Sequence, residues 1–214
     1  MDDLLQWAAP LMAPLFTLWG SPVSRAEGLG VLLSLAMVAC NMRVHPAAWP
    51  LAITSSLLYA LLFASAKLYG EAGLQLFFVA MAAWGWWSWL RGTDAQGSPW
   101  RVHRLSPRQR GLALLATLLA WPALAGLLMH ATDSNTPWLD ALPTVGSIVG
   151  TVLLARKAID NWPTWVAVNL VSIALFLSKG LWLTTALYAV FALLALAGWR
   201  AWLALERDDG RALA

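Results

Sequence analysis

The sequence predicts an all-α, polytopic membrane protein, and two observations carry that prediction: its composition and the pattern of its hydrophobic runs. Of the 214 residues, 60% are hydrophobic and only 12% are charged, and the mean hydropathy is +0.64. A soluble domain with this composition would expose too much apolar surface to stay dispersed. The runs are long and rich in Leu and Ala. They lack the alternation of a barrel wall, so we expect helices to cross the bilayer.

Seven runs are candidates for crossing the hydrocarbon core as helices. In chain order they lie near residues 28–42, 49–66, 74–90, 111–131, 141–155, 165–177 and 181–203. The earlier run at residues 4–20, LLQWAAPLMAPLFTLWG, contains two prolines and has no basic region before it. We interpret residues 1–24 as an interfacial or re-entrant segment and not as a signal peptide. Whether residues 4–20 form an eighth span stays open.

The Lys and Arg residues predict the direction of insertion, because they are retained on the cytoplasmic side. With the amino end outside, eleven of the fourteen lie inside, and only Arg25, Lys67 and Lys179 lie outside. We therefore expect an external amino end and a cytoplasmic carboxyl end. The basic loop at residues 92–110 is interpreted as a solvated connector, which explains its charge without binding of nucleic acid or lipid headgroups.

The chain also contains an internal repeat, seen when it is offset against itself by 113 positions (140 minus 27) without gaps. Coincidences of Ala and Leu are expected by chance, whereas rarer residues in one register indicate a duplication. The matched pairs are Glu27 with Asp140, Ser34 with Ser147, Arg43 with Arg156, Trp49-Pro50 with Trp162-Pro163, Phe63 with Phe176, Phe78 with Phe191, and Gly85-Trp86-x-x-Trp89 with Gly198-Trp199-x-x-Trp202.

The repeat predicts the domain organisation. Both copies begin outside and end inside, so they are parallel repeats, and one further helix must return the chain across the membrane between them. Parallel repeats are one of the transporter plans, with the substrate site near the midplane where the halves meet. The expected parts are the amino-terminal segment 1–24, a first three-helix repeat 25–91, the basic loop 92–110, a linker helix 111–131, a second three-helix repeat 138–204 and a cytoplasmic tail 205–214.

Two motif regions carry a resemblance to a known family. One is LQLFFVAMAAWGWWSWLRG at residues 74–92, and the other runs from Asp140 through SIVGTVLLARKAIDNWPTWVAVN to LYAVFALLALAGWRAW. The GW-x-x-W and N-W-x-x-W-x-x-x-N patterns are specific in combination and weak singly. From about Arg25 to Trp202, the chain resembles the PnuC-type vitamin transporters of bacterial inner membranes.

The resemblance implies a SWEET-like fold and facilitated diffusion of a vitamin that is trapped by phosphorylation in the cytoplasm. It favours nicotinamide riboside as the substrate, with thiamine or riboflavin as alternatives. It also implies an inner-membrane location with a periplasmic amino end, no cofactor, and a homotrimer, because SWEET-like folds often pack as trimers. No G-x-x-x-x-G-K-[ST] loop occurs in the chain, which excludes a built-in P-loop ATPase.

An aromatic vitamin requires stacking faces and hydrogen-bonding groups in a mostly apolar pocket. Because such a ligand lacks the symmetry of the repeat, residues that differ between the two copies are the leading contacts. The pairs that differ are Trp165 with Ala52, Asn169 with Ser56, and Tyr188 with Gln75. Helical spacing puts Trp162, Trp165 and Asn169 on one stripe, although Trp162 recurs as Trp49 and so belongs first to the scaffold.

The expected substrate-binding set is completed by Phe78 and Asp140. Asp140 and its counterpart Glu27 lie near the amino ends of equivalent helices, where acidic groups stabilise a helix. Capping is the default role, and attraction of a cationic vitamin is the alternative. For Gln75, near the outer end of its span, a solvated or structural role competes with a ligand contact.

Catalysis and metal binding are not expected. Cys40 is the only cysteine, and no Cys/His cluster has metal-ligand spacing. His45, His103 and His130 have no partners in sequence. An integral-membrane enzyme using His or Asp residues at the membrane surface, and a sensor that binds without transporting, are the competing interpretations.

Overall fold

The computed structural model describes residues 10–11, 13–18, 21–65, 69–93, 97, 100–131, 136–178 and 182–212. Within these ranges the regular elements are helices apart from one short hairpin, and loops connect them, which confirms the predicted all-α class. The elements are β1 (Pro14–Leu18), β2 (Ser21–Ser24), α2 (Arg25–Met42), α3 (Ala48–Ser65), α4 (Tyr69–Arg91), α5 (Pro107–Ala131), α6 (Pro137–Ala155), α7 (Asn161–Ser178) and α8 (Trp182–Ala212).

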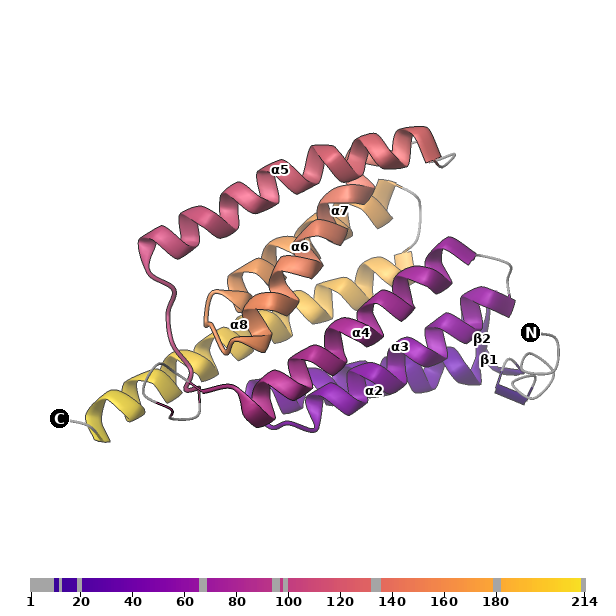
Figure 1. The fold of residues 1–214 in the computed structure, drawn as a ribbon. Helices are drawn as coiled ribbons and strands as arrows, with labels where there is room; N and C mark the ends of the chain where they lie inside the picture. The colour runs from indigo at the N-terminus through magenta and orange to yellow at the C-terminus, as the bar shows by residue number, and fades with distance from the viewer. Residues whose placement is uncertain are drawn as a thin grey trace. The chain divides into compact units, whose positions relative to one another are not determined.

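The helices divide between two units (Figure 1). The first unit, residues 1–90, contains the hairpin and α2, α3 and α4, and α3 packs along α2. In the second unit, residues 91–214, α7 packs against both α6 and α8, and α5 packs along α6. The order of three helices, one linker and three helices matches the predicted architecture.

Six helices are long and apolar enough to cross a membrane: α2, α3, α5, α6, α7 and α8 from Thr184 to Asp208. The other long helix described, α4, has 23 residues and is long enough to span as well. Its Gln75 and its cluster of four tryptophans lower its hydropathy. Tryptophan favours the interfaces of a bilayer, so this composition suits a helix that reaches from one interface to the other.

The hairpin was not predicted from the sequence. β1 and β2 pair antiparallel, with Pro14 opposite Ser24 and Thr17 opposite Pro22. Prolines disfavour a continuous helix here, and a pair of four- to five-residue strands is too short to show alternation. Whether residues 1–24 lie at the interface stays a prediction, and residues 1–9 lie outside the described part.

The amino ends of the helices follow local chemistry. The Ser24 hydroxyl accepts a hydrogen bond from the Glu27 N–H at 3.1 Å, which caps α2 with the Ser-x-x-Glu spacing of a capping box. At the start of α6, the Thr136 hydroxyl donates to Asp140 Oδ1 at 3.2 Å. Both acidic residues therefore have a local role in the first turn of equivalent helices.

The helices α4, α5, α6 and α7 begin four or five residues before the predicted spans. α7 begins at Asn161, four residues before the predicted span, and Pro163 lies in its first turn as Pro50 does in α3. A proline in the first turn costs no intrahelical hydrogen bond. α8 continues to Ala212, so most of the expected tail is helical.

The turn after the first helix of each repeat shows the duplication in the backbone. Val44 has φ 53° and Lys157 has φ 55°, and these residues are equivalent in the repeat. A left-handed conformation is uncommon for residues other than glycine. The helix-ending residues before them, Arg43 and Arg156, have φ of −94° and −90°. Two copies of an unusual turn at matching positions support the internal repeat independently of side-chain identity.

A tryptophan, a glycine and a second tryptophan pack together in each repeat. In the first unit, the Trp49 ring lies against Gly85 and makes an edge contact with Trp89, with ring centroids 5.4 Å apart. In the second unit, Trp162 lies against Gly198, 5.6 Å from Trp202. A Cβ atom on either glycine would overlap the ring. We call each set a Trp-Gly-Trp contact.

Part of the basic loop is bound to the second unit and is not a free connector. His103 forms backbone hydrogen bonds with Lys157 and Ile159, and Lys157 Nζ donates to the Trp100 carbonyl oxygen at 2.9 Å. Burial lowers the pKa of Lys157. Sequence analysis missed this docking, because it joins residues more than 50 positions apart.

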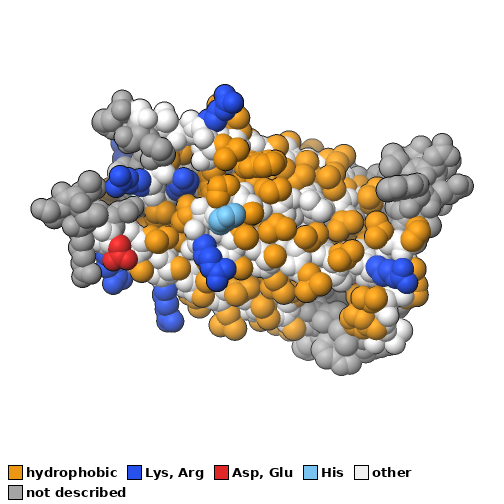
Figure 2. Space-filling model, turned by 90° about the horizontal axis from the view of Figure 1, so that it is seen from below, with side chains coloured by type: hydrophobic (Ala, Val, Ile, Leu, Met, Phe, Trp, Pro, Cys, Tyr) orange, Lys and Arg blue, Asp and Glu red, His pale blue; other side chains and the backbone are white. Residues whose placement is uncertain are grey.

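Large apolar side chains on the surface indicate contact with lipid. On α5, the exposed set includes Leu112, Leu114, Leu118, Leu119 and Leu127, each at least half exposed. Figure 2 shows hydrophobic side chains covering most of the face it draws, with few Lys and Arg side chains among them. Water would disfavour this surface and hydrocarbon would not, which agrees with a multi-pass membrane protein.

Replacing Gly198 by Ala should destabilise the protein, because the added Cβ overlaps the buried Trp162 ring and overpacking costs about 1–3 kcal/mol. Gly85→Ala should have the same effect. The matched control is Gly126→Ala on α5, where nothing lies within 4 Å of an added Cβ. Thermal unfolding in detergent, followed by size exclusion, measures all three. A melting temperature for Gly198→Ala equal to that of the control would contradict the prediction.

Candidate functional site

Four side chains form a line along one face of α7. Trp165, Asn169, Ser172 and Phe176 follow the spacing i, i+4, i+7 and i+11, which puts them on one helical face. Asn169 is 5% exposed and Ser172 is 2% exposed, whereas the two aromatic residues are partly buried. We call these four residues the α7 line.

The two ends of the α7 line contact different neighbours. At one end, the indole of Trp165 lies against Gly150 of α6, where an added Cβ would be 3.0 Å from Cε2. At the other end, the Phe176 ring lies 5.0 Å from the ring of Tyr188 on α8, and Tyr188 makes an edge contact with Phe191 at 6.1 Å. Two polar side chains therefore lie between two rings along one helix, an arrangement that suits a flat ligand with polar substituents.

Asn169 is the polar centre of the α7 line. The residue as a whole is 5% exposed, and we find no hydrogen bond from its carboxamide to any other residue that the structure describes. A carboxamide in an apolar setting is stabilised by a hydrogen-bond partner. Such a group in a transmembrane helix is a candidate for ligand contact.

Two other predicted site residues have local structural roles, although the buried Nε1 of Trp162 has no hydrogen-bond partner among the described residues. Trp162 is 3% exposed, because Gly198 and Trp202 pack against its ring. Asp140 lies in the first turn of α6 and accepts the Thr136 hydroxyl. Trp162 therefore packs in the scaffold one turn before Trp165 on α7, and Asp140 lies at the start of another helix, α6.

Gln75 and Phe78 lie on α4, in the first unit. Both are partly buried, and Phe78 makes an edge contact with its neighbour Phe77 at 5.9 Å. The spacing of three residues puts Gln75 and Phe78 on one side of α4, so this unit also offers an amide beside a ring.

The first unit contains a polar cluster that sequence reasoning missed. The Gly30 carbonyl oxygen accepts hydrogen bonds from the hydroxyls of Ser34 and Ser55, at 2.8 Å and 3.2 Å. The Tyr59 ring lies against Gly30. The equivalents of Gly30, Ser55 and Tyr59 in the second unit are Pro143, Val168 and Ser172. The middles of the two repeats therefore differ in chemistry, although their Trp-Gly-Trp contacts are the same.

Ser172 and Phe176 were also missed as neighbours of the predicted contacts. The helical period that linked Trp165 to Asn169 would have found both, because they lie three and seven residues beyond Asn169. No pattern in the sequence indicated Gly150, because its contact with Trp165 depends on how α6 and α7 are aligned.

The described residues contain no group of three His, Cys, Asp or Glu side chains that could hold a metal ion. His45 and His103 take part in local contacts, with the Ala47 N–H and the Arg101 carbonyl oxygen respectively. Neither contact resembles the hydrogen-bonded acid and base pairs of hydrolytic enzymes.

Residues 24–204 match the nicotinamide mononucleotide transporter family. The chain is 32% identical over 199 residues to the riboflavin/roseoflavin transporter RibM of Streptomyces davaonensis, covering 92% of each chain. It is 26% identical over 216 residues to the nicotinamide riboside transporter PnuC of Escherichia coli, covering 89% of this chain and 90% of that one.

The fold matches the crystal structure of the vitamin B3 transporter PnuC with a TM-score of 0.68. The match covers 86% of this chain and 82% of that one, at 22% identity. The family and these relatives are transporters, which confirms that the chain is not an enzyme. We conclude that this multi-pass membrane protein belongs to the nicotinamide mononucleotide transporter family, the family of PnuC.

Proposed function

We propose that the protein is an inner-membrane facilitator that imports a vitamin with an aromatic ring, with its amino end in the periplasm. The observation that supports this most is the α7 line, in which a tryptophan and an asparagine occur in one copy of a duplicated scaffold only. The equivalents of Trp165 and Asn169 are Ala52 and Ser56. A ligand without two-fold symmetry requires such a difference between the halves.

Nicotinamide riboside is the first candidate substrate. The PnuC relatives of Escherichia coli and Neisseria mucosa are nicotinamide riboside transporters, and the solved structure of the same fold is a vitamin B3 transporter. Phosphorylation of the imported vitamin in the cytoplasm would hold it inside and draw further molecules down their gradient. A homotrimer is the proposed assembly.

Riboflavin is the second candidate substrate, and a specific observation favours it. The riboflavin/roseoflavin transporter RibM is 32% identical to this chain over 92% of both sequences. The isoalloxazine ring of riboflavin is larger than nicotinamide and uncharged. It would require more stacking surface and no acidic partner.

We assign roles to the predicted contacts by their chemistry. Trp165 stacks on the vitamin ring, and Asn169 binds a carboxamide or hydroxyl of the ligand. Tyr188, Gln75 and Phe78 add a hydroxyl, an amide and a further ring. Trp162 supports the site through the scaffold. Asp140 attracts a cationic vitamin, which applies to nicotinamide riboside and thiamine but not to riboflavin.

The decisive experiment is uptake into proteoliposomes containing the purified protein. Labelled nicotinamide riboside, riboflavin and thiamine are supplied separately, without an ion gradient or ATP. Facilitated diffusion predicts saturable uptake of one of them that stops at equal concentrations on both sides. Uptake of none of the three would reject the proposal, and saturable uptake of riboflavin alone would move the second candidate to first place.

Replacing Trp165 by Ala should raise the KM for uptake about tenfold, because a stacking contact and the apolar area it buries are lost. The melting temperature of this variant should change little, since Trp165 is only partly buried. Trp87→Ala is the matched control, because Trp87 is 61% exposed. Equal KM values for the two variants would remove Trp165 from the site.

Replacing Asn169 by Leu separates a ligand role from a packing role. The carboxamide has no described partner in the protein, so the melting temperature of the free protein should stay level or rise. The stabilisation by added vitamin should be lost. Thr54→Val on α3 is the control, because it also removes a polar group from a helix. A large fall in melting temperature with unchanged ligand stabilisation would show that Asn169 is structural.

A further inference from the structure

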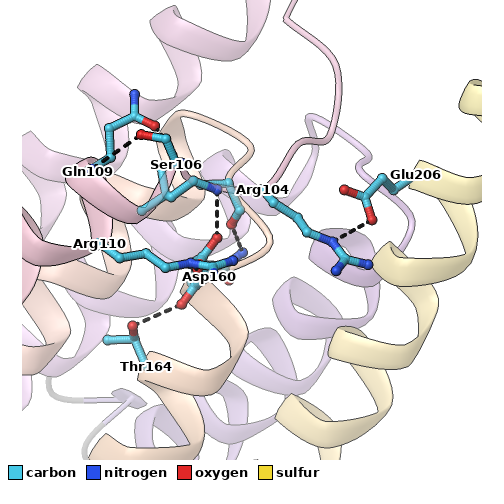
Figure 3. Close-up of polar contacts among 10 residues, drawn as sticks. Arg104, Ser106, Gln109, Arg110, Asp160, Thr164 and Glu206 are labelled. Atoms are coloured by element: carbon cyan, nitrogen blue, oxygen red, sulfur yellow. Dashed lines mark hydrogen bonds and ion pairs between the residues drawn. The ribbon is translucent and has the colours of Figure 1, made fainter.

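The linker helix α5 is attached to the rest of the second unit near its amino end and just past its middle. Just past the middle, Trp121 Nε1 donates to the Trp138 carbonyl oxygen at 2.8 Å, and the two rings make an edge contact at 5.7 Å. Near its amino end, Arg110 Nε lies 2.6 Å from Asp160 Oδ1, and the Leu105 N–H donates to Asp160 Oδ2 at 2.9 Å (Figure 3). Between these two attachments, the structure contains an apolar groove.

The groove has a volume of about 410 Å³ and is lined by α5, α6 and α7. It is open because several of its lining residues are small, among them Ala113 on α5, Gly146 on α6 and Ala167 on α7. The rest of the lining is mostly aliphatic, including Leu114, Val149 and Val171. An elongated apolar group is the chemistry that this lining accepts.

A second, basic pocket of about 240 Å³ adjoins the groove. Its lining includes Arg104, Arg110 and Arg207 together with Trp199. The two cavities share Arg110, Asp160 and Pro163, so the basic pocket lies at the Arg110 end of the groove. A charged head and an apolar tail of one molecule would fit the pair.

The charges of the basic pocket favour an anion. Arg104 pairs with Glu206 at 2.8 Å and Arg110 pairs with Asp160 at 2.6 Å, each through Nε (Figure 3). Both arginine side chains are about half exposed, and no hydrogen bond to the described residues uses their Nη atoms. Arg207 has no carboxylate partner among the described residues. Three guanidinium groups against two carboxylates leave one positive charge in excess.

We propose that the groove and the basic pocket together bind one anionic phospholipid. The phosphate contacts Arg104, Arg110 and Arg207, and an acyl chain lies between α5, α6 and α7. Basic pockets at helix ends bind anionic headgroups on the cytoplasmic side of membranes, the side to which the Lys and Arg distribution assigns this end. Arg110 lies at the start of a membrane-spanning helix, where a headgroup meets the hydrocarbon core.

The test is native mass spectrometry of the full-length protein with phosphatidylglycerol and with phosphatidylcholine of the same acyl chains. We expect phosphatidylglycerol to bind about fivefold more tightly, because the pocket has one positive charge in excess and each basic charge near a lipid headgroup contributes roughly 1 kcal/mol. The variant R104Q/R207Q should lose this preference. The variant R101Q/R108Q, which removes two exposed arginines outside the pocket, should keep it.

A second pair of variants tests the acyl chain. Ala113→Trp fills the groove and should abolish retention of both lipids, whereas Ala116→Trp, at an exposed position of α5 outside the lining, should not. This pair of variants also tests whether a lipid occupies the groove if the R104Q/R207Q variant fails to fold.

Three outcomes would overturn the proposal. Equal retention of the two lipids by the wild-type protein would show that charge does not select the ligand. Binding of glycerol phosphate that is as tight as that of the lipid and unaffected by Ala113→Trp would show a free phosphate site. A change in oligomeric mass in Ala113→Trp with unchanged lipid binding would show that a second copy of the chain covers the groove. None of these outcomes depends on transport, so the proposed function is tested separately.

Discussion

In each repeat, the ring of a tryptophan near the start of the second helix lies directly on a glycine of the third helix. The close approach of Trp49 to Gly85, and of Trp162 to Gly198, leaves no room for a Cβ atom. The edge contact with a second tryptophan, at 5.4 Å and 5.6 Å, fixes the orientation of the ring as well. In the second unit this contact sets how α7 is turned against α8. The direction of every other side chain on α7, including the α7 line, depends on it.

The duplicated scaffold holds unequal middles. In the first unit a tyrosine ring, that of Tyr59, covers Gly30 beside two serine hydroxyls. In the second unit a tryptophan ring, that of Trp165, covers Gly150. The two rings occupy positions that are not equivalent in the repeat. One scaffold carrying different residues in its two copies suits the proposed substrate, because that substrate lacks two-fold symmetry.

The second repeat has also acquired contacts that the first lacks. Asp160 and Lys157 hold the loop before α5, and their equivalents are Ala47 and Val44. The loop can therefore dock on the turn after α6, but the corresponding turn after α2 lacks these groups. The same docking gives α5 its fixed start, and it brings Arg104 and Arg110 to the edge of the apolar groove. One partly buried carboxylate, that of Asp160, thus organises the linker helix and the basic pocket together.

Much of this protein was determined by its sequence alone. Hydrophobic composition and run length predict the membrane helices, since only helices satisfy the backbone within lipid at this length. The 113-residue offset predicts the repeat, and the helical period places Trp165 and Asn169 on one face. The short hairpin was not predicted from the sequence, because strands of four or five residues leave too little pattern to detect.

Only the tertiary structure decided which groups meet. The contact of Trp165 with Gly150, the docking of His103 beside Lys157 and the junction of the basic pocket with the groove each join separate helices or loops. Periodicity describes one helix at a time, and it carries no information on the rotation or offset of one helix against another. Those follow from the packing of side chains such as Trp162 against a bare glycine, a fit that exists only once the chain has folded.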